Sequence, residues 1–487
     1  MGNYKTDAIW QHSVKELTSA YKSRDLTPVD AARAALQRAE EVDAVLNAFT
    51  VIDHDGAIAS ARVSQERWRR GAPLSPIDGI PTTIKDIVWC HGLDVRYGSR
   101  ATPDSSSKPD SPSVQRLRNA GAVILGLTIT PEFGWKAVTD NPKDGVARNP
   151  WDHAKTPGGS SGGAAIAAAT GAGVLHLGTD GGGSVRIPSS FTGIVGLKPS
   201  YGRVAAYPAS SFGTVAHIGP MARTVEDAAA MLNAMAGRDL RDWTQPVQEF
   251  PELSLSQVNW SGKRVGYWKT PCIGGVDKTV AEAIERVLKD LELAGASVTE
   301  IQLPDQEALE IFLCLWYVGA ANRLSWIDPG QHDLIDPGFL RVARIGQRYS
   351  AVDRMQAEIR RAQFGARMDA LLDEFAYLVS PTVPIPAFCA GSEVPEGSGF
   401  ESSFEWSSFS FPINLSQQPA CSVPCGFTPD GLPIGMQIVG PRGADGSVLS
   451  AALTYQHMYP ERFLIPGGKW PALDGRRDWC SPQPISC

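Results

Sequence analysis

The sequence predicts an α/β fold: a single large domain with a mixed, mostly parallel, twisted sheet, helices on both faces and a helical N-terminal segment. Residues 264–303 have the pattern of a strand, a helix and a second strand, and such a crossover implies parallel pairs and covering helices. Residues 122–128 are a short apolar run of β-favouring residues, typical of a buried strand. The 487 residues contain no repeat or low-complexity linker, so we expect one domain over residues 1–487.

Helices are predicted through the first part of the chain, over about residues 1–65. Thr27 and Pro28 form a helix start, because a hydroxyl caps the free N–H groups and proline loses no hydrogen bond at the first helical position. The apolar residues that follow recur with helical period to Val45. Thr224 is expected to begin another helix that ends near Gly237.

The second half of the chain continues the alternation of helices and strands. Residues 340–374 predict one long polar helix, and residues 376–380 a strand that ends at a proline. Residues 392–411 are rich in Gly, Ser and Phe and predict a loop. These elements complete the sheet and the pocket around a central segment over about residues 75–205.

Composition excludes several classes of function. The chain is 43% hydrophobic and 20% charged, with a net charge of −7, and without a basic stripe it does not fit a nucleic-acid binder. Eight scattered cysteines predict free thiols in a reducing compartment. The pair Cys421 and Cys425 has no neighbouring ligand to complete a metal site, so we expect no metal and no cofactor.

The chain also predicts a cytoplasmic protein that does not enter a membrane. The N-terminus has no basic start followed by an apolar stretch, so no secretory signal is expected. The longest run of small apolar residues, 164–178, contains glycines and a histidine and is too short to span a bilayer. The oligomeric state stays open, with a homodimer as one alternative.

Two clusters of glycine and serine, residues 157–163 (PGGSSGG) and 178–186 (GTDGGGSVR), are the most unusual part of the chain. Glycines let backbone N–H groups approach a ligand, and a hydroxyl beside a row of free N–H donors suits a serine nucleophile with an oxyanion hole. A phosphate loop would need GxxxxGK(S/T) or GxGxxG between strand and helix, and neither is present. Structural turns are the remaining plain interpretation.

A nucleophile elbow of the Gly-x-Ser-x-Gly type is formally matched by residues 158–162. Residues 149–157 before it resemble a loop rather than the buried strand that an elbow follows. A Ser-His-Asp triad also needs a later histidine, and His217, His332 and His457 lack a supporting context. This alternative is therefore disfavoured.

Longer motifs in the same region resemble the amidase signature family. They are residues 78–86 (DGIPTTIKD), Gly126 with 131–133 (PEF), 148–151 (RNPW), both glycine-serine clusters, 187–188 (IP) and 193–199 (GIVGLKP). The tail segments 418–424 (QPACSVP) and 432–440 (LPIGMQIVG) are similar to the family's C-terminal pattern. The resemblance covers nearly the whole chain, with several long motifs in order.

The resemblance implies a Ser–cis-Ser–Lys triad made of Ser184, Ser160 and Lys85. Ser184 would be the nucleophile, and Ser160, with a cis peptide bond to Gly159, would relay protons to and from Lys85. The resemblance also implies an oxyanion hole made of the N–H groups of Gly181, Gly182, Gly183 and Ser184.

The environment of Lys85 must favour its neutral form, because a charged ammonium cannot accept a proton. Apolar neighbours in the sequence suit a buried lysine, and Asp86 is expected to face away, since adjacent side chains of an extended segment point to opposite faces. Asp180 and Arg186 are expected to form an ion pair that fixes the glycine loop. Ser161 is expected to be structural.

The resemblance places Gly134 and Trp135 on the acyl side of a substrate pocket. The aromatic segment 404–411 and Trp316 with Tyr317 are candidates for its mouth, with core packing as the alternative for each. Departures from the family pattern lie at Gly181, at residues 126–129 (GLTI) and at Gln417 and Gln418. None of them touches the triad, so they bear on the choice of substrate.

The sequence therefore predicts a cofactor-independent serine amidohydrolase. It would hydrolyse the C–N bond of a small, aryl or otherwise apolar, linear amide through an acyl-enzyme, with ester or carbamate side activity. The alternative is one chain of a tRNA-dependent amidotransferase that acts with a partner chain. That protein's typical lysine motif reads here as Lys85-Asp86-Ile87, and its MDEFA stretch as residues 130–134 (TPEFG), which favours the stand-alone amidase. A non-catalytic binding protein that keeps the fold is a third possibility, disfavoured by the intact triad.

Overall fold

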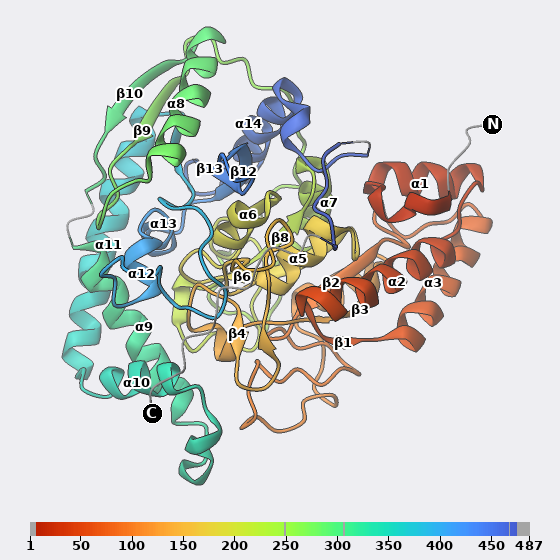
Figure 1. Cartoon of the computed structure of the whole chain (residues 1–487), viewed down its shortest axis with the longest axis horizontal. Helices are drawn as coiled ribbons and strands as arrows, with labels where there is room; N and C mark the ends of the chain where they lie inside the picture. Colours follow the sequence, from red (N-terminus) through yellow and green to blue (C-terminus); the bar gives the residue numbers. More distant parts are fainter. Residues whose placement is uncertain (1–5, 248–249, 305–306, 467, 475–487) are drawn as a thin grey trace.

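The computed structural model describes residues 6–247, 250–304, 307–466 and 468–474. Strands from all parts of the chain join one 11-stranded sheet (Figure 1). In spatial order its strands are β1 (Phe49–Ile52), β3 (Val123–Thr128), β2 (Pro81–Lys85), β6 (Leu175–Asp180), β8 (His217–Ala222), β7 (Val195–Lys198), β12 (Ala420–Phe427), β13 (Pro433–Val439), β11 (Tyr377–Pro381), β9 (Arg264–Trp268) and β10 (Ser297–Ile301). A two-stranded ribbon, β4 (Asp140–Asn141) and β5 (Gly145–Val146), lies apart.

The sheet is mixed, and its parallel pairs form two groups. Strands β3, β2 and β6 run parallel near one end, and β11, β9 and β10 run parallel at the other. Antiparallel pairs join these groups through β8, β7, β12 and β13. The predicted α/β class with a large mixed sheet is confirmed, and the predicted crossover of residues 264–303 is β9, helix α8 and β10.

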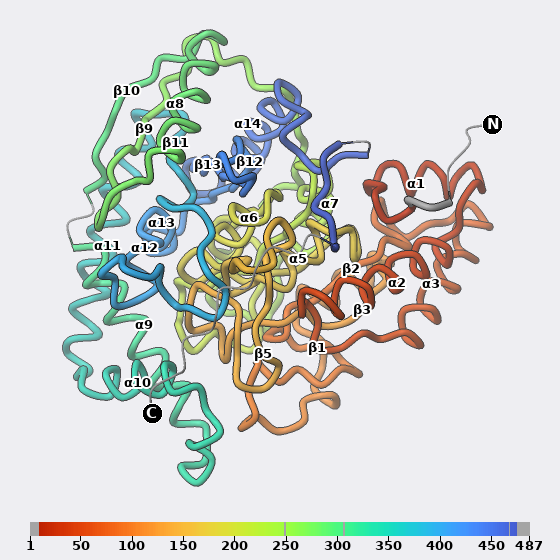
Figure 2. Tube along the Cα trace, in the orientation of Figure 1, coloured from red at the N-terminus to blue at the C-terminus, as the bar shows by residue number. Residues whose placement is uncertain are grey.

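Helices cover both faces of the sheet. Those longer than one turn are α1 (Val14–Ser23), α2 (Pro28–Leu46), α3 (His54–Arg69), α4 (Pro112–Asn119), α5 (Gly162–Thr170), α6 (Arg186–Thr192), α7 (Val225–Met235), α8 (Lys278–Leu293), α9 (Ala308–Leu324), α10 (Pro337–Gly346), α11 (Ala351–Glu374), α13 (Phe411–Ser416) and α14 (Asp445–Met458). Helices α4, α7, α8 and α14 share one large apolar core on one face. Most apolar residues of α2, α3, α5 and α6 belong to separate, smaller clusters on the other face. Figure 2 shows α1–α3 at one end of the molecule and α9–α11 at the other.

The N-terminal helix start lies where the sequence places it. The Thr27 hydroxyl accepts a hydrogen bond from the Asp30 N–H, and the Asp30 carboxylate accepts one from the Thr27 N–H, so α2 begins with a capping box. The N-terminal segment is not wholly helical, however, because β1 lies between α2 and α3. Its residues pair antiparallel with β3, a long-range partner that a local pattern cannot reveal.

Two further expectations are corrected. Residues 340–374 form two helices rather than one, because Ser350 and Asp353 make a capping box that starts α11 afresh after α10 has ended at Gly346. Residues 392–411 are not entirely loop, since a short helix, α12 (Ser403–Trp406), and the first residue of α13 lie in this stretch. Aromatic side chains of this segment are buried, and their packing holds these turns in place.

Four of the described cysteines follow the prediction. Cys90, Cys314, Cys421 and Cys425 are free thiols. Cys389 is disulfide-bonded, so the expectation that every thiol is free is wrong at this position, and Cys480 and Cys487 lie outside the described residues.

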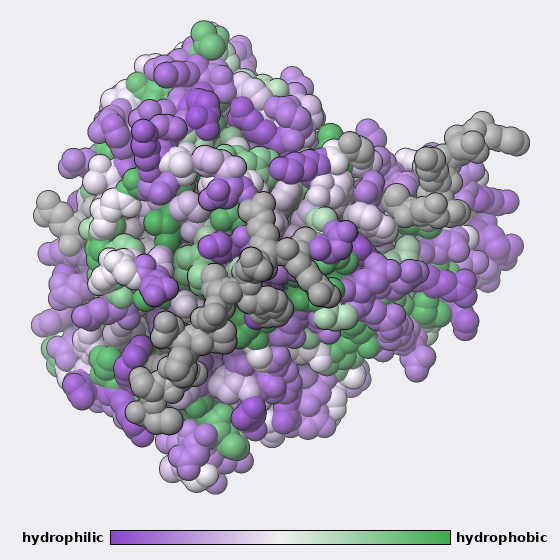
Figure 3. All heavy atoms as spheres, viewed as in Figure 1, coloured by the Kyte–Doolittle hydropathy of each residue, from purple (hydrophilic) through white to green (hydrophobic). Residues whose placement is uncertain are grey.

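The surface in Figure 3 is largely hydrophilic, with apolar residues scattered in small groups. Over the described ranges, no helix combines the length and apolar character that crossing a bilayer requires.

Candidate active site

Three segments far apart in the sequence meet beside the ends of β2 and β6. Lys85 is the last residue of β2, Ser160 lies just before α5, and Ser184 lies in the loop between β6 and α6. The carboxyl ends of parallel neighbouring strands lie at the same edge of a sheet, which is where such folds bind ligands. The peptide bond between Gly159 and Ser160 is cis, as the sequence resemblance implied.

Lys85 is fully buried among hydroxyl groups. Its Nζ lies 2.7 Å from Ser160 Oγ, 2.9 Å from Ser161 Oγ and 3.0 Å from Thr179 Oγ1. Burial lowers the pKa of Lys85 well below its usual value, and the charge of Asp180 opposes this shift only in part. The site therefore favours an uncharged amine.

Asp86 faces away from the amine, as expected. Its carboxylate accepts hydrogen bonds from the backbone N–H groups of Arg96 at 2.8 Å and Gly98 at 3.1 Å. Burial raises the pKa of Asp86 to about 7, although these two hydrogen bonds favour its ionised form.

The hydrogen bonds around Lys85 restrict the direction of each proton. A neutral amine has two N–H donors and one lone pair, so one of the three hydroxyls must donate to it. Ser161 already donates to the Thr179 carbonyl at 3.1 Å and accepts from the Thr179 N–H at 3.2 Å, so it can only accept from Lys85. The donating hydroxyl is thus Ser160 or Thr179, and Ser160 is the closer of the two.

The glycine loop presents several backbone donors to the same region. The Gly183 N–H donates to Asp180 Oδ1 at 2.8 Å, so this donor is occupied. The N–H groups of Gly181, Gly182 and Ser184 have no acceptor among the residues that the structure describes. Of the four N–H donors that the resemblance implied, those of Gly181, Gly182 and Ser184 are therefore free, and that of Gly183 is not.

Aromatic packing explains why the first two loop positions are glycine. A Cβ atom on Gly181 would lie 2.8 Å from the Trp316 ring, and one on Gly182 would lie 2.8 Å from the Phe312 ring. These rings stack on each other, with centroids 5.3 Å apart. Any side chain at either position would displace the aromatic cluster of α9.

Ser184 shares the cavity with Ser160 but makes no hydrogen bond to it. The two segments are joined through the backbone, where the Ser161 N–H donates to the Ser184 carbonyl at 3.1 Å. The Ser184 side chain has no hydrogen-bond partner among the described residues, and both serines line one cavity. Lys85 and Ser160 are thus in direct contact, and Ser184 faces the same space.

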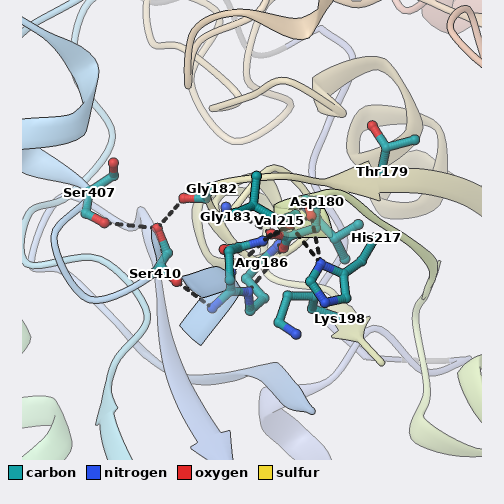
Figure 4. Close-up of polar contacts among 12 residues, drawn as sticks. Thr179, Asp180, Gly182, Gly183, Arg186, Lys198, Val215, His217, Ser407 and Ser410 are labelled. Atoms are coloured by element: carbon teal, nitrogen blue, oxygen red, sulfur yellow. Dashed lines mark hydrogen bonds and ion pairs between the residues drawn. The ribbon is translucent and has the colours of Figure 1, made fainter. Parts of the chain in front are cut away.

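A buried ion pair holds the glycine loop. Arg186 binds Asp180 through two hydrogen bonds of 2.9 Å, and both side chains are fully buried. Arg186 also donates to the Ser410 carbonyl at 3.0 Å (Figure 4). It donates as well to the side chains of Asn414 and Gln437, each at 2.6 Å. Burial alone would raise the pKa of Asp180, but Arg186 reverses this and holds it well below its usual value. The predicted Asp180–Arg186 pair is confirmed.

The cavity has a volume of about 140 Å³ and is lined mainly by apolar and aromatic side chains. Gly134 lies in its wall, where a Cβ would come within 3.2 Å of Ser160 Oγ. Trp135 does not line it: its side chain is buried in the core, and only its carbonyl is near the wall, accepting a hydrogen bond from Trp316 at 3.0 Å. The side chain of Trp135 thus does not line this cavity, and its expected role in substrate binding stays a prediction.

The aromatic candidates for the mouth of the cavity divide in the same way. Trp316 lines it, whereas Tyr317 and residues 404–411 do not. Phe404 packs edge-on against Trp316, with centroids 5.4 Å apart, so this segment supports the wall from behind.

Most of the cavity wall was not predicted from the sequence, and two of the residues missed, Thr179 and Arg323, bear directly on its chemistry. Thr179 contacts Lys85, and the signal for it was the strand before the glycine loop, since the end of β6 must lie beside the end of β2. Arg323 lines the cavity from α9, and no sequence signal distinguishes it from an exposed arginine on a helix.

Comparisons with known proteins agree on the family. The family model described as Amidase matches residues 30–449. A glutamyl-tRNA(Gln) amidotransferase chain of Symbiobacterium thermophilum is 34% identical over 472 residues, covering 91% of this chain and 96% of that protein. An acylamidase of Rhodococcus erythropolis is 33% identical over 456 residues, covering 92% and 95%. The crystal structure of a bacterial aryl acylamidase, of the amidase signature enzymes family, matches with a TM-score of 0.85 and 26% identity over 94% of this chain and 99% of that one.

The ion pair beneath the glycine loop generates a stability prediction. Asp180→Asn keeps the shape of the side chain but leaves the buried Arg186 charge uncompensated, so we expect the free energy of unfolding to fall by about 3–5 kcal/mol. Urea denaturation measures it. The matched control is Arg264→Gln, which breaks the half-exposed pair with Glu374 and should cost less than about 1 kcal/mol. Equal losses in the two variants would contradict the role of the buried pair.

Proposed function

This chain belongs to the amidase signature family, and on that basis we propose that it is a stand-alone serine amidase. It would hydrolyse the C–N bond of a small, aryl or otherwise apolar, amide through an acyl-enzyme. The observation that carries the proposal is the amine of Lys85, buried among hydroxyls with a lowered pKa, beside a cavity that Ser160 and Ser184 share.

In this mechanism Ser184 Oγ attacks the carbonyl carbon of the amide. A serine hydroxyl is a weak nucleophile and needs a base. Ser160 takes the proton from Ser184 as its own proton passes to the lone pair of Lys85. The hydrogen-bond pattern around Lys85 supports this direction, because Ser161 is limited to accepting.

The negative charge that develops on the substrate oxygen would be held by the free N–H groups of Gly181, Gly182 and Ser184. Such donors each contribute about 3–4 kcal/mol to transition-state stabilisation. Gly183 is omitted from this set because its N–H is bound to Asp180. The relay then protonates the leaving amine, and water attacks the acyl ester by the same route in reverse.

The cavity wall supports an apolar acyl or amine group, since Phe133, Phe212 and Trp316 line it. Esters and carbamates place a carbonyl in the same position, so we expect them as side activities.

The second candidate is one chain of an amidotransferase complex, favoured by the similarity to the Symbiobacterium protein. The two candidates differ in what the isolated chain does. A stand-alone amidase should hydrolyse simple anilides at a rate that neither glutamine nor a co-purifying chain changes. Hydrolysis that appears only with glutamine and a second polypeptide would support the amidotransferase, and turnover assays with size-exclusion chromatography decide between them.

The nucleophile is tested by intact mass spectrometry after incubation with a fluorophosphonate. We expect one adduct on the wild type and none on Ser184→Ala, because only a serine with a base and an oxyanion hole reacts readily. Ser211→Ala, which alters another serine of the cavity wall, is the matched control and should keep the adduct. An unlabelled wild type of native fold would contradict the assignment.

The proton relay predicts a pH dependence. Lys85 must be neutral to accept a proton, so kcat/KM should fall as pH drops through its lowered pKa and reach a plateau above it. Because burial raises the pKa of Asp86 to about 7, the profile is measured in wild type and in Asp86→Asn. The falling limb should persist in Asp86→Asn, and a profile that is flat from about pH 5 to 9 would be inconsistent with Lys85 as the base.

A further inference from the structure

Arg323 is a cation in the cavity wall whose side chain has no ion-pair or hydrogen-bonding partner among the described residues. It lies near the end of α9 and lines the same cavity as Ser184. Its Nε is buried and makes no hydrogen bond. Within the described ranges, its guanidinium forms no ion pair and donates no hydrogen bond, whereas the buried Arg186 and Arg203 each bind an aspartate.

Aromatic rings surround this guanidinium. Its central carbon lies 4.4 Å from the ring centroid of Tyr97, 4.6 Å from Phe133 and 5.3 Å from Trp326. Cation–π contacts of this kind stabilise the charge, but they leave the N–H donors unused. A guanidinium has five such donors in a planar fork that matches a carboxylate.

The nearest acidic side chain does not supply the missing acceptor. The charge of Glu132 influences Arg323 electrostatically, without a hydrogen bond between the two side chains. Glu132 Oε2 accepts its hydrogen bond from the Asp336 N–H. Burial raises the pKa of Glu132 to about 7, which weakens its negative charge near neutral pH. Arg323 therefore faces the cavity with donors that the described part of the protein leaves open.

The position of Arg323 relates it to the reacting end of the cavity. Phe133 contacts the guanidinium, and the next residue, Gly134, lies against Ser160. Because Phe133 borders the guanidinium and the next residue borders Ser160, one small molecule can extend from Arg323 to the serine. The wall of the same cavity includes the aromatic side chains of Phe133, Phe212 and Trp316.

We propose that Arg323 is a specificity-determining residue that binds a carboxylate of the substrate, so that the preferred amides carry an anionic group separated from the scissile bond by a short apolar segment. The inference rests on the proposed amidase function, whose substrate it narrows. It assigns the open donors of Arg323 to the substrate, while the aromatic rings hold the guanidinium in place before binding.

The test compares amides that differ only in charge. One pair is 4-acetamidobenzoate and 4-acetamidoacetophenone, with the group on the amine half. The other is the succinic acid monoanilide and its methyl ketone analogue, 4-oxo-N-phenylpentanamide, with the group on the acyl half. We expect wild type to prefer the acid in at least one pair by about 10- to 100-fold in kcat/KM, mainly through KM, the range for a hydrogen bond to a charged group.

Variants locate the preference at Arg323. Arg323→Gln should abolish it, and Arg323→Lys should restore part of it, because lysine keeps the charge without the fork. The control is Arg341→Gln, an exposed arginine of α10, which should leave the preference intact. The preference is the ratio of kcat/KM for the acid to kcat/KM for the ketone within each variant. A smaller fraction of folded enzyme lowers both values equally and leaves this ratio unchanged.

The outcomes separate this inference from the function on which it rests. Hydrolysis of both members of each pair at equal rates overturns the role of Arg323 and leaves the amidase proposal standing. If wild type hydrolyses none of the four compounds, the amidase proposal fails for these amides. Calorimetric binding of 4-acetamidobenzoate and its ketone analogue to wild type and Arg323→Gln then decides, and the absence of an Arg323-dependent preference for the acid overturns the inference.

Discussion

The burial of the Lys85 amine, which lowers its pKa, is the constraint on which the rest of the site depends. Removing an ammonium from water disfavours its charge, but a nearby carboxylate would restore it. Asp86 is adjacent to Lys85 in the sequence, and the charge of Asp180 acts on Lys85 across the fold. Asp86 is turned to the backbone of residues 96–98, and Asp180 is occupied by Arg186 and Asn414. Each of these acidic side chains therefore has its own partners, and the amine meets only hydroxyls.

The same partners organise the glycine loop that carries Ser184. Asp180 accepts the Gly183 and Val185 N–H groups, so the carboxylate that must be kept from Lys85 also shapes the turn that presents Ser184. Arg186 extends this network to α13 and β13. Helix α13 and strand β13, from the C-terminal part of the chain, thus support the glycine loop of its middle part. The central segment alone therefore does not build the site, which also needs the C-terminal strands of the sheet.

Sequence reasoning recovered what depends on local pattern and on long motifs. The cap at Thr27, the crossover from β9 to β10 and the Asp180–Arg186 pair could be predicted because neighbouring residues determine them. The new start of α11 at Ser350 was missed because the apolar period continues across the break. Trp135 and Arg323 show the limit most clearly: whether an aromatic ring faces the core or a cavity, and whether an arginine on a helix has a partner, depends on side chains from distant segments.

The packing of Gly181 and Gly182 against Trp316 and Phe312 has a consequence for how this protein can change during evolution. Trp316 lines the cavity, and together with Phe312 it is also one of the two rings against which the first two glycines of the loop pack. A substitution that enlarges the cavity at Trp316 would also remove support from the backbone donors, so a new substrate would be gained at the expense of rate. Residues 207–211 line the cavity from another segment and are not among the atoms nearest to a Cβ at Gly181 or Gly182, so substitutions there carry no such penalty. We therefore expect the substrate range to change during evolution through substitutions at residues 207–211, while Trp316 and Phe312 are retained.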